Sequence, residues 1–180
     1  MAYLILDRDG VINHDSDDYI KSPEEWLPLP GSLEAIAIAN RAGFHVIVVT
    51  NQSGLARGYF DINTLNAIHK KMNQKIARLG GRIEAIFFCP HAPDEGCDCR
   101  KPKPGMLNEI RDRLNISLEK VWFVGDTFAD IQAARSADAV PVLVRTGKGE
   151  KTLAADNDLT GVSIYPDLAS CIEALVNEKN

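Results

Sequence analysis

The sequence lacks an apolar run of the roughly 20 residues that a membrane-spanning helix requires. It also lacks the charged region and longer apolar stretch of a secretory signal peptide, so we expect a cytoplasmic protein. Basic residues are fewer than acidic ones, 20 against 25, and the resulting charge of −5 argues against a nucleic-acid binder. We therefore expect an enzyme or small-molecule binding protein, acting as a monomer with neither nucleic acid nor membrane as a partner.

The sequence also lacks internal repeats, low-complexity tracts and any composition shift that marks a domain boundary. Hydrophobic residues make up 45% of the 180 residues, which is enough for one domain with a proper core. We expect residues 1–180 to form that single domain.

Short apolar segments alternate with helical stretches along the whole chain. Strands are expected over 3–6, 44–49, 83–88, 121–124 and 140–144. Helices are expected from Leu33 to near Gly43, from the turn at 61–64 to Gly80, over 106–114, from Asp130 to about Ala137 and, after a Gly-Lys-Gly loop, at the C terminus. Such alternation predicts a doubly wound α/β fold, a parallel sheet with helices on both faces.

Two carboxylates follow the first expected strand, because Asp7-Arg8-Asp9-Gly10 comes directly after the apolar residues 3–6. In open α/β sheets this carboxyl edge is where ligands bind. Two carboxylates spaced by two residues repel each other unless a cation or a shared proton separates them. Taken alone, the pair is equally typical of solvated loop aspartates.

Other strand ends carry polar groups in the same way: Thr50 with Asn51, then Lys101, then Asp126 with Asp130. Together, and in this order, they resemble the four motifs of the haloacid dehalogenase-like phosphatases. Those motifs are Asp-x-Asp, a Ser or Thr, a Lys, and an acidic Gly-Asp-x-x-x-Asp. The resemblance covers nearly the whole chain and implies that the four ends meet at the point where the strand order reverses.

The resemblance also implies a role for each motif residue. Asp7 would attack phosphorus and form an aspartyl-phosphate, while Asp9 would give the leaving oxygen its proton and later activate water. Asp7, Asp126 and the backbone carbonyl of Asp9 would hold Mg²⁺, which prefers hard oxygen ligands. Thr50 and Lys101 would bind the phosphoryl oxygens, where transition-state charge is spread.

Two lysines compete for the third motif. The family pattern Lys-Pro-x-Pro favours Lys101, and Lys103 is then a solvated charge. Asp130 lies four residues past Asp126, on the same helix face, where it would orient Lys101 or a metal-bound water.

Three of the four cysteines lie within eleven residues, beside a histidine. A complete Cys₃His set of this kind is typical of structural Zn²⁺, and its ligands would be Cys89, His91, Cys97 and Cys99. Reduced thiols in a mobile loop are the alternative, whereas a catalytic zinc would need an open position. The metal would stiffen the small loop that presents Arg100 and Lys101.

This zinc loop resembles the branch that contains D-glycero-D-manno-heptose-1,7-bisphosphate 7-phosphatases and histidinol-phosphate phosphatases. The segments Asp-Arg-Asp-Gly-Val-Ile-Asn, Thr-Asn-Gln-Ser-Gly and Cys-Asp-Cys-Arg-Lys-Pro look like the heptose enzymes, although the loop is shorter than in many members. The resemblance implies Mg²⁺-dependent removal of the heptose 7-phosphate, a step toward ADP-heptose and the lipopolysaccharide core. Histidinol phosphate as the substrate, or a non-catalytic zinc-stabilised binding domain, remain the alternatives.

No stretch after the first or third expected strand is long enough for a large cap domain. We therefore expect an open site, closed only by residues 15–19 and the zinc loop. The remote phosphate of a sugar bisphosphate would lie near Arg100. Sugar contacts are expected from the polar residues Asp15, Asp18, Asn51, Gln52 and Ser53.

Overall fold

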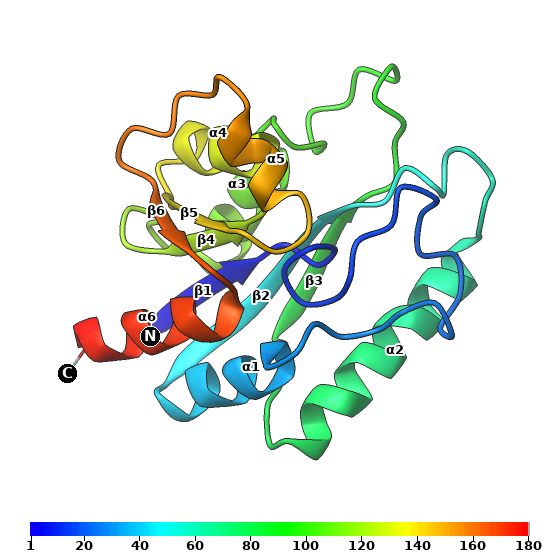
Figure 1. Cartoon of the computed structure of the whole chain (residues 1–180). Helices are drawn as coiled ribbons and strands as arrows, with labels where there is room; N and C mark the ends of the chain where they lie inside the picture. Colours follow the sequence, from blue (N-terminus) through cyan, green and yellow to red (C-terminus); the bar gives the residue numbers. More distant parts are fainter. Residues whose placement is uncertain (180) are drawn as a thin grey trace.

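Six parallel strands form one sheet in the order β3-β2-β1-β4-β5-β6 (Figure 1). The structure, a computed structural model, describes residues 1–179. The strands are β1 (Ala2–Leu6), β2 (Phe44–Asn51), β3 (Ala85–Cys89), β4 (Trp122–Gly125), β5 (Val140–Val144) and β6 (Ser163–Tyr165). The chain winds outward from β1 in one direction and then from β4 in the other, so the order reverses between these two strands.

Helices cover both faces of the sheet (Figure 1). They are α1 (Ser32–Arg41), α2 (Ile62–Arg78), α3 (Gly105–Leu114), α4 (Phe128–Ser136), α5 (Gly149–Ala154) and α6 (Leu168–Lys179). Side chains of α1, α2 and α6 share one core cluster, and those of α3 and α4 share the other. The expected doubly wound α/β architecture is confirmed.

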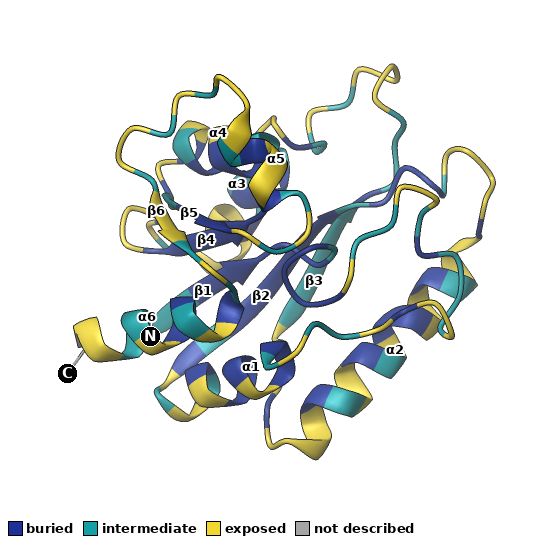
Figure 2. Ribbon diagram, in the orientation of Figure 1, coloured by how far each residue is buried: buried dark blue, intermediate teal, exposed yellow. Residues whose placement is uncertain are grey.

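Strand β1 divides its side chains between the two cores. Leu4 and Leu6 lie in the cluster with α1, and Ile5 lies in the cluster with α3. This alternation follows from the two-residue period of a strand. All three are fully buried, as are most residues of the central strands (Figure 2), and each contributes about 1.5–3 kcal/mol by its burial. The residues that follow β1 therefore start from a rigid support.

Two helices begin at capping side chains. The Asp61 carboxylate accepts a hydrogen bond from the Thr64 backbone N–H at 2.8 Å, at the start of α2. At the start of α4, Thr127 and Asp130 form a capping box, in which Asp130 Oδ2 accepts from the Thr127 N–H and hydroxyl. Asp130 is thereby held in place by its own helix.

The long connection after β1 is anchored although it has no regular structure of its own. Isolated bridges pair Asn13 with Asp9 and with Pro28. Trp26 is fully buried, and Lys71 of α2 donates to the carbonyl oxygens of Pro23 and Trp26. These contacts tie the connection to helix α2 and hold its polar tip near the carboxyl edge of the sheet.

The sequence prediction missed two short elements, α5 and β6. Strand β6 has only three residues, and the first of them is a serine, so it contains no apolar run of the length that marked the other strands. Helix α5 has six residues, too few to show a helical period. Within residues 1–179 no domain-sized insertion interrupts the fold, and no helix combines the length and apolarity needed to cross a membrane.

Candidate active site

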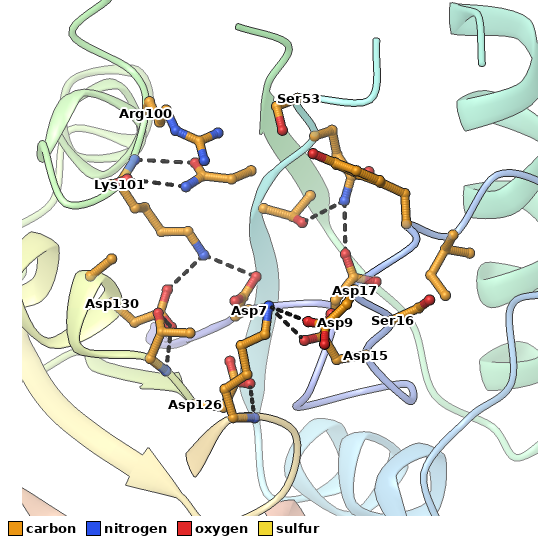
Figure 3. Close-up of a pocket in the computed structure, with 18 residues that line it drawn as sticks. Asp7, Asp9, Asp15, Ser16, Asp17, Ser53, Arg100, Lys101, Asp126 and Asp130 are labelled. Atoms are coloured by element: carbon orange, nitrogen blue, oxygen red, sulfur yellow. Dashed lines mark hydrogen bonds and ion pairs between the residues drawn. The ribbon is translucent and has the colours of Figure 1, made fainter. Parts of the chain in front are cut away.

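The carboxyl ends of β1, β2 and β4 open into a cavity of about 360 Å³ (Figure 3). Most of the residues predicted to form the site line this cavity. Its lining includes Asp7, Asp9, Asp15, Thr50, Asn51, Gln52, Ser53, Arg100, Lys101, Asp126 and Asp130. Asp18 is the exception, since it is exposed and lies outside the lining, whereas its neighbour Asp17 lies within it.

Lys101 is at the centre of the charged groups. Its ammonium lies 2.9 Å from Asp7 Oδ1 and 2.7 Å from Asp130 Oδ1 (Figure 3). It also donates to the Val49 carbonyl at 3.1 Å. Burial opposes its charge, but the two carboxylates outweigh burial and raise the pKa of Lys101 above its ordinary value. Lys101 is therefore a fixed positive charge inside the cavity.

Three carboxylates gather around one space, because oxygen atoms of Asp7, Asp126 and Asp130 all lie within 4.8 Å of one another. Burial raises the pKa of Asp7 to about 7. Burial, together with the charges of Asp130 and Asp7, raises the pKa of Asp126 to about 8. Carboxylates that are this hard to ionise side by side are a favourable environment for a cation.

Asp126 in particular fits a divalent cation. Its Oδ1 is buried and has no hydrogen-bond partner among the described residues. Its Oδ2 accepts the Lys148 backbone N–H at 2.7 Å. A Cβ at Gly10 or at Gly147 would lie 2.1 or 2.2 Å from this Oδ2, so only glycine allows the two loops to approach so closely. A buried, unpaired carboxylate oxygen facing other carboxylates matches the donor set that Mg²⁺ prefers.

The Asp9 carboxylate points to a different set of partners. It accepts hydrogen bonds from Arg8, from Asn13 Nδ2 at 2.8 Å and from Gln52 Nε2 at 3.0 Å. Burial favours the neutral form, but the Arg8 charge and these hydrogen bonds prevail and lower the pKa of Asp9. The side chain is thus held as a carboxylate, and only the backbone of Asp9 remains for the metal contact predicted from the sequence.

The residues at the end of β2 hold their neighbours in place. Thr50 is buried, and its hydroxyl accepts from Gln52 Nε2 at 2.9 Å. The Asn51 side chain accepts the Lys101 N–H and donates to the Lys101 carbonyl, both at 3.1 Å. Since both ends of this amide are occupied, the structure gives Asn51 the task of fixing the Lys101 backbone. Its contact with substrate stays a prediction.

The four expected zinc ligands lie together at the end of β3. Cys89 Sγ is 3.2 Å from Cys99 Sγ and 3.6 Å from Cys97 Sγ, and His91 Nδ1 is 3.3 Å from Cys99 Sγ. A tetrahedral zinc with bonds of about 2.3 Å would place its sulfur ligands roughly 3.8 Å apart. The cysteines are free thiols rather than disulfides, so this cluster fits a structural Zn²⁺.

The same loop separates the two candidate lysines. Lys103 turns outward and donates to the Cys97 carbonyl at 2.8 Å, with its side chain 49% exposed, whereas the side chain of Lys101 is 3% exposed. Arg100 lines the cavity and donates to the His91 carbonyl at 3.3 Å. A metal held by the four ligands would therefore stiffen the segment that presents Arg100 and Lys101.

Comparison with known proteins places this arrangement in a family. Residues 3–138 match the family described as haloacid dehalogenase-like hydrolase. The chain belongs to the haloacid dehalogenase-like hydrolases. It is 54% identical over 175 residues to a D-glycero-beta-D-manno-heptose-1,7-bisphosphate 7-phosphatase of Pseudomonas aeruginosa, covering 97% of this chain and 98% of that protein.

Solved structures agree with this membership of the hydrolase family. The D,D-heptose 1,7-bisphosphate phosphatase of B. bronchiseptica, complexed with magnesium and phosphate, superposes with a TM-score of 0.97 at 53% identity and covers 99% of both chains. The corresponding phosphatase of Burkholderia thailandensis gives a TM-score of 0.78 at 43% identity, with 98% of this chain and 99% of that chain covered. The resemblance stated from the motifs is thereby confirmed.

Two residues of this hydrolase site were not predicted from the sequence. Lys148, in the Gly-Lys-Gly loop after β5, lies 3.1 Å from Asp15 and 3.6 Å from Asp17, besides binding Asp126 through its backbone. Arg8, between the two motif aspartates, is fully buried. Lys148 could have been predicted because it is flanked by glycines just after a strand. Arg8 could have been predicted because it is a charged residue between the two motif aspartates.

Proposed function

We propose that this chain is a phosphatase that removes the 7-phosphate from D-glycero-β-D-manno-heptose 1,7-bisphosphate. One observation carries the proposal: a chain similar over its full length to proteins of that name has Asp7, Lys101 and Asp130 in contact at the strand ends. The names of the relatives suggest the substrate. The buried cluster offers the groups that phosphoryl transfer requires.

We propose that Asp7, Asp126 and the backbone carbonyl of Asp9 hold Mg²⁺, as the unpaired Asp126 Oδ1 suggests. The magnesium-bound relative supports this choice of metal. When bound, the ion supplies positive charge that offsets the repulsion between a carboxylate nucleophile and a phosphate dianion.

The proposed reaction has two halves. In the first, the Asp9 carboxylate takes up a proton, an Asp7 oxygen attacks phosphorus, the bond from phosphorus to the sugar oxygen breaks, and Asp9 gives that oxygen the proton. In the second, Asp9 takes a proton from water, the water oxygen attacks phosphorus, and Asp7 is released. Lys101 keeps Asp7 in place through its 2.9 Å contact, and it stabilises charge on the phosphoryl oxygens together with Thr50.

For the rest of the substrate we propose contacts around the cavity rim. Arg100 would bind the remote phosphate, because a planar guanidinium can bind an anion through two hydrogen bonds. Asp15 and Ser53 line the same cavity and would bind sugar hydroxyls. Asp18 is exposed outside the lining, so Asp17 is the better placed residue of that pair.

We further propose that Cys89, His91, Cys97 and Cys99 bind a structural Zn²⁺, and that the chain acts as one domain and a monomer in the cytoplasm. The clustering of three cysteines with a histidine supports the metal site, because clustered cysteines bind metal rather than form disulfides in a reducing compartment.

The deciding experiment compares kcat/KM for the heptose bisphosphate, histidinol phosphate and p-nitrophenyl phosphate with Mg²⁺ present. We expect the heptose bisphosphate to be preferred and Asp7→Asn to lose several orders of magnitude in rate on all three substrates. Asp112→Asn is the matched control, since this exposed carboxylate on α3 pairs only with its neighbour Arg111 among the contacts described. A preference for histidinol phosphate would overturn the substrate, and an Asp7→Asn variant with more than about a tenth of wild-type activity would overturn the nucleophile.

A further inference from the structure

Arg8 is a charged side chain enclosed in the protein beside the proposed acid–base residue. Its Nε and Nη2 donate to Asp9 Oδ1 at 3.0 and 2.9 Å, and Nη2 also reaches Asp9 Oδ2 at 3.0 Å. Its Nη1 points elsewhere, to Nε2 of His69 on helix α2 at 3.2 Å. One guanidinium therefore connects a motif aspartate to a histidine that is 61 residues away from Arg8 in the chain.

The chemistry of the two groups determines the direction of this hydrogen bond. A guanidinium has five donors and no acceptor, so His69 Nε2 must be the acceptor. The imidazole is then neutral, with its proton on Nδ1. Burial and the nearby Arg8 charge agree with this state, because they lower the pKa of His69 to about 4.

We propose that His69 is a positioning residue that fixes Asp9 through Arg8, an inference that rests on the role proposed above for Asp9. The imidazole holds one end of the guanidinium and Asp9 holds the other, so the plane of the carboxylate is set by two parallel contacts. Asn13 and Gln52 complete the enclosure at 2.8 and 3.0 Å. His69 itself touches no reacting atom.

Loss of the imidazole lone pair would leave Arg8 Nη1 buried without a partner. An unpaired buried donor is energetically costly, so the guanidinium would turn to find another acceptor. Because the same guanidinium holds Asp9, this rotation would displace the Asp9 carboxylate from the position it needs for proton transfer. The two halves of the reaction respond differently when p-nitrophenyl phosphate is the substrate. Since p-nitrophenolate leaves without a proton, transfer of the phosphoryl group to Asp7 does not need Asp9, whereas its hydrolysis does.

Rapid-mixing kinetics with p-nitrophenyl phosphate test this difference. We expect His69→Leu to release a first equivalent of p-nitrophenol at a rate within about twofold of wild type, followed by steady-state turnover that is about tenfold or more slower. His69→Gln should recover most of the turnover, because its amide oxygen can accept from Nη1. Met72→Leu is the control, since Met72 is buried one turn further along α2 and should change neither phase.

Nitrogen NMR of the labelled wild-type protein gives a readout independent of activity. We expect His69 Nε2 to show the chemical shift of an unprotonated ring nitrogen and Nδ1 that of a protonated one. A protonated Nε2, or a His69→Leu variant in which both kinetic phases slow equally, or no recovery in a folded His69→Gln, would overturn the proposal. Wild type that hydrolyses no phosphate ester would instead overturn the phosphatase function itself, so the two failures are distinguishable.

Discussion

The Asp126 carboxyl group, which lines the cavity, illustrates how far burial and neighbouring charges can raise a pKa. Its pKa is raised to about 8 by burial and by Asp130 and Asp7. Below about pH 4 the group is protonated in both the folded and the unfolded chain. As the pH rises from there to about 8, the unfolded chain ionises first, so the stability that this group contributes is progressively lost. A bound cation requires the ionised form and offsets this loss.

We therefore expect the metal-free protein to lose thermal stability between about pH 5 and pH 8, and the rise in Tm caused by Mg²⁺ to grow over the same range. The measurement is a series of melting curves with and without Mg²⁺ for wild type, Asp126→Asn and the exposed control Asp112→Asn. Asp126→Asn should flatten the pH dependence and lose most of the Mg²⁺ effect. A magnesium shift in Tm that stays constant with pH in wild type would contradict the expectation.

At the scale of elements, the expected zinc loop connects the end of β3 to Arg100 and Lys101, which we propose bind phosphate. Cys89 is the last residue of the strand, and Cys99 directly precedes Arg100 and Lys101. The Lys101 ammonium lies 2.9 Å from Asp7 Oδ1, so movement of this loop would displace Lys101 from Asp7. We expect the loop to affect the reaction through the position of these two residues.

We expect elemental analysis of protein prepared without chelators to find about one zinc per chain. Cys97→Ser should lower the zinc content and reduce kcat/KM, by less than Asp7→Asn does. Cys171→Ala is the control, because this cysteine of α6 is buried in the core and should leave the zinc in place. Mild chelation followed by Mg²⁺ should restore activity, and protein without zinc at full activity would refute the role of the loop.

At the scale of the whole molecule, side chains from segments far apart in the sequence line one cavity. The segments come from both ends of the sequence, since Asp15 follows β1 and Lys148 follows β5. The cavity therefore depends on the packing of the whole chain around the sheet.

We expect light scattering to give a mass near 19.8 kDa, the mass of one chain, at the concentrations used for kinetics. Specific activity should then be independent of protein concentration, because a monomer does not dissociate when it is diluted. A dimer whose activity falls on dilution would contradict this expectation.

The sequence by itself determined the fold class and the family. Five apolar strands, each followed by polar residues, predicted a doubly wound sheet, and the sheet is confirmed. The Asp7–Asp9 motif and the later polar strand ends predicted the family, which the comparisons confirm. These features are local in sequence, because a strand's period and the residue at its end are set by neighbouring positions. Their chemical roles remain predictions that the proposed variants test.

Only the tertiary structure decided which charges meet. Lys148 contacts Asp15, and His69 contacts Arg8, across long stretches of chain. Such pairings depend on loop paths and on burial, which removes competing water and makes a charged partner necessary. Spacing along the sequence does not predict these contacts, because each is made by the packing of separate elements around the sheet.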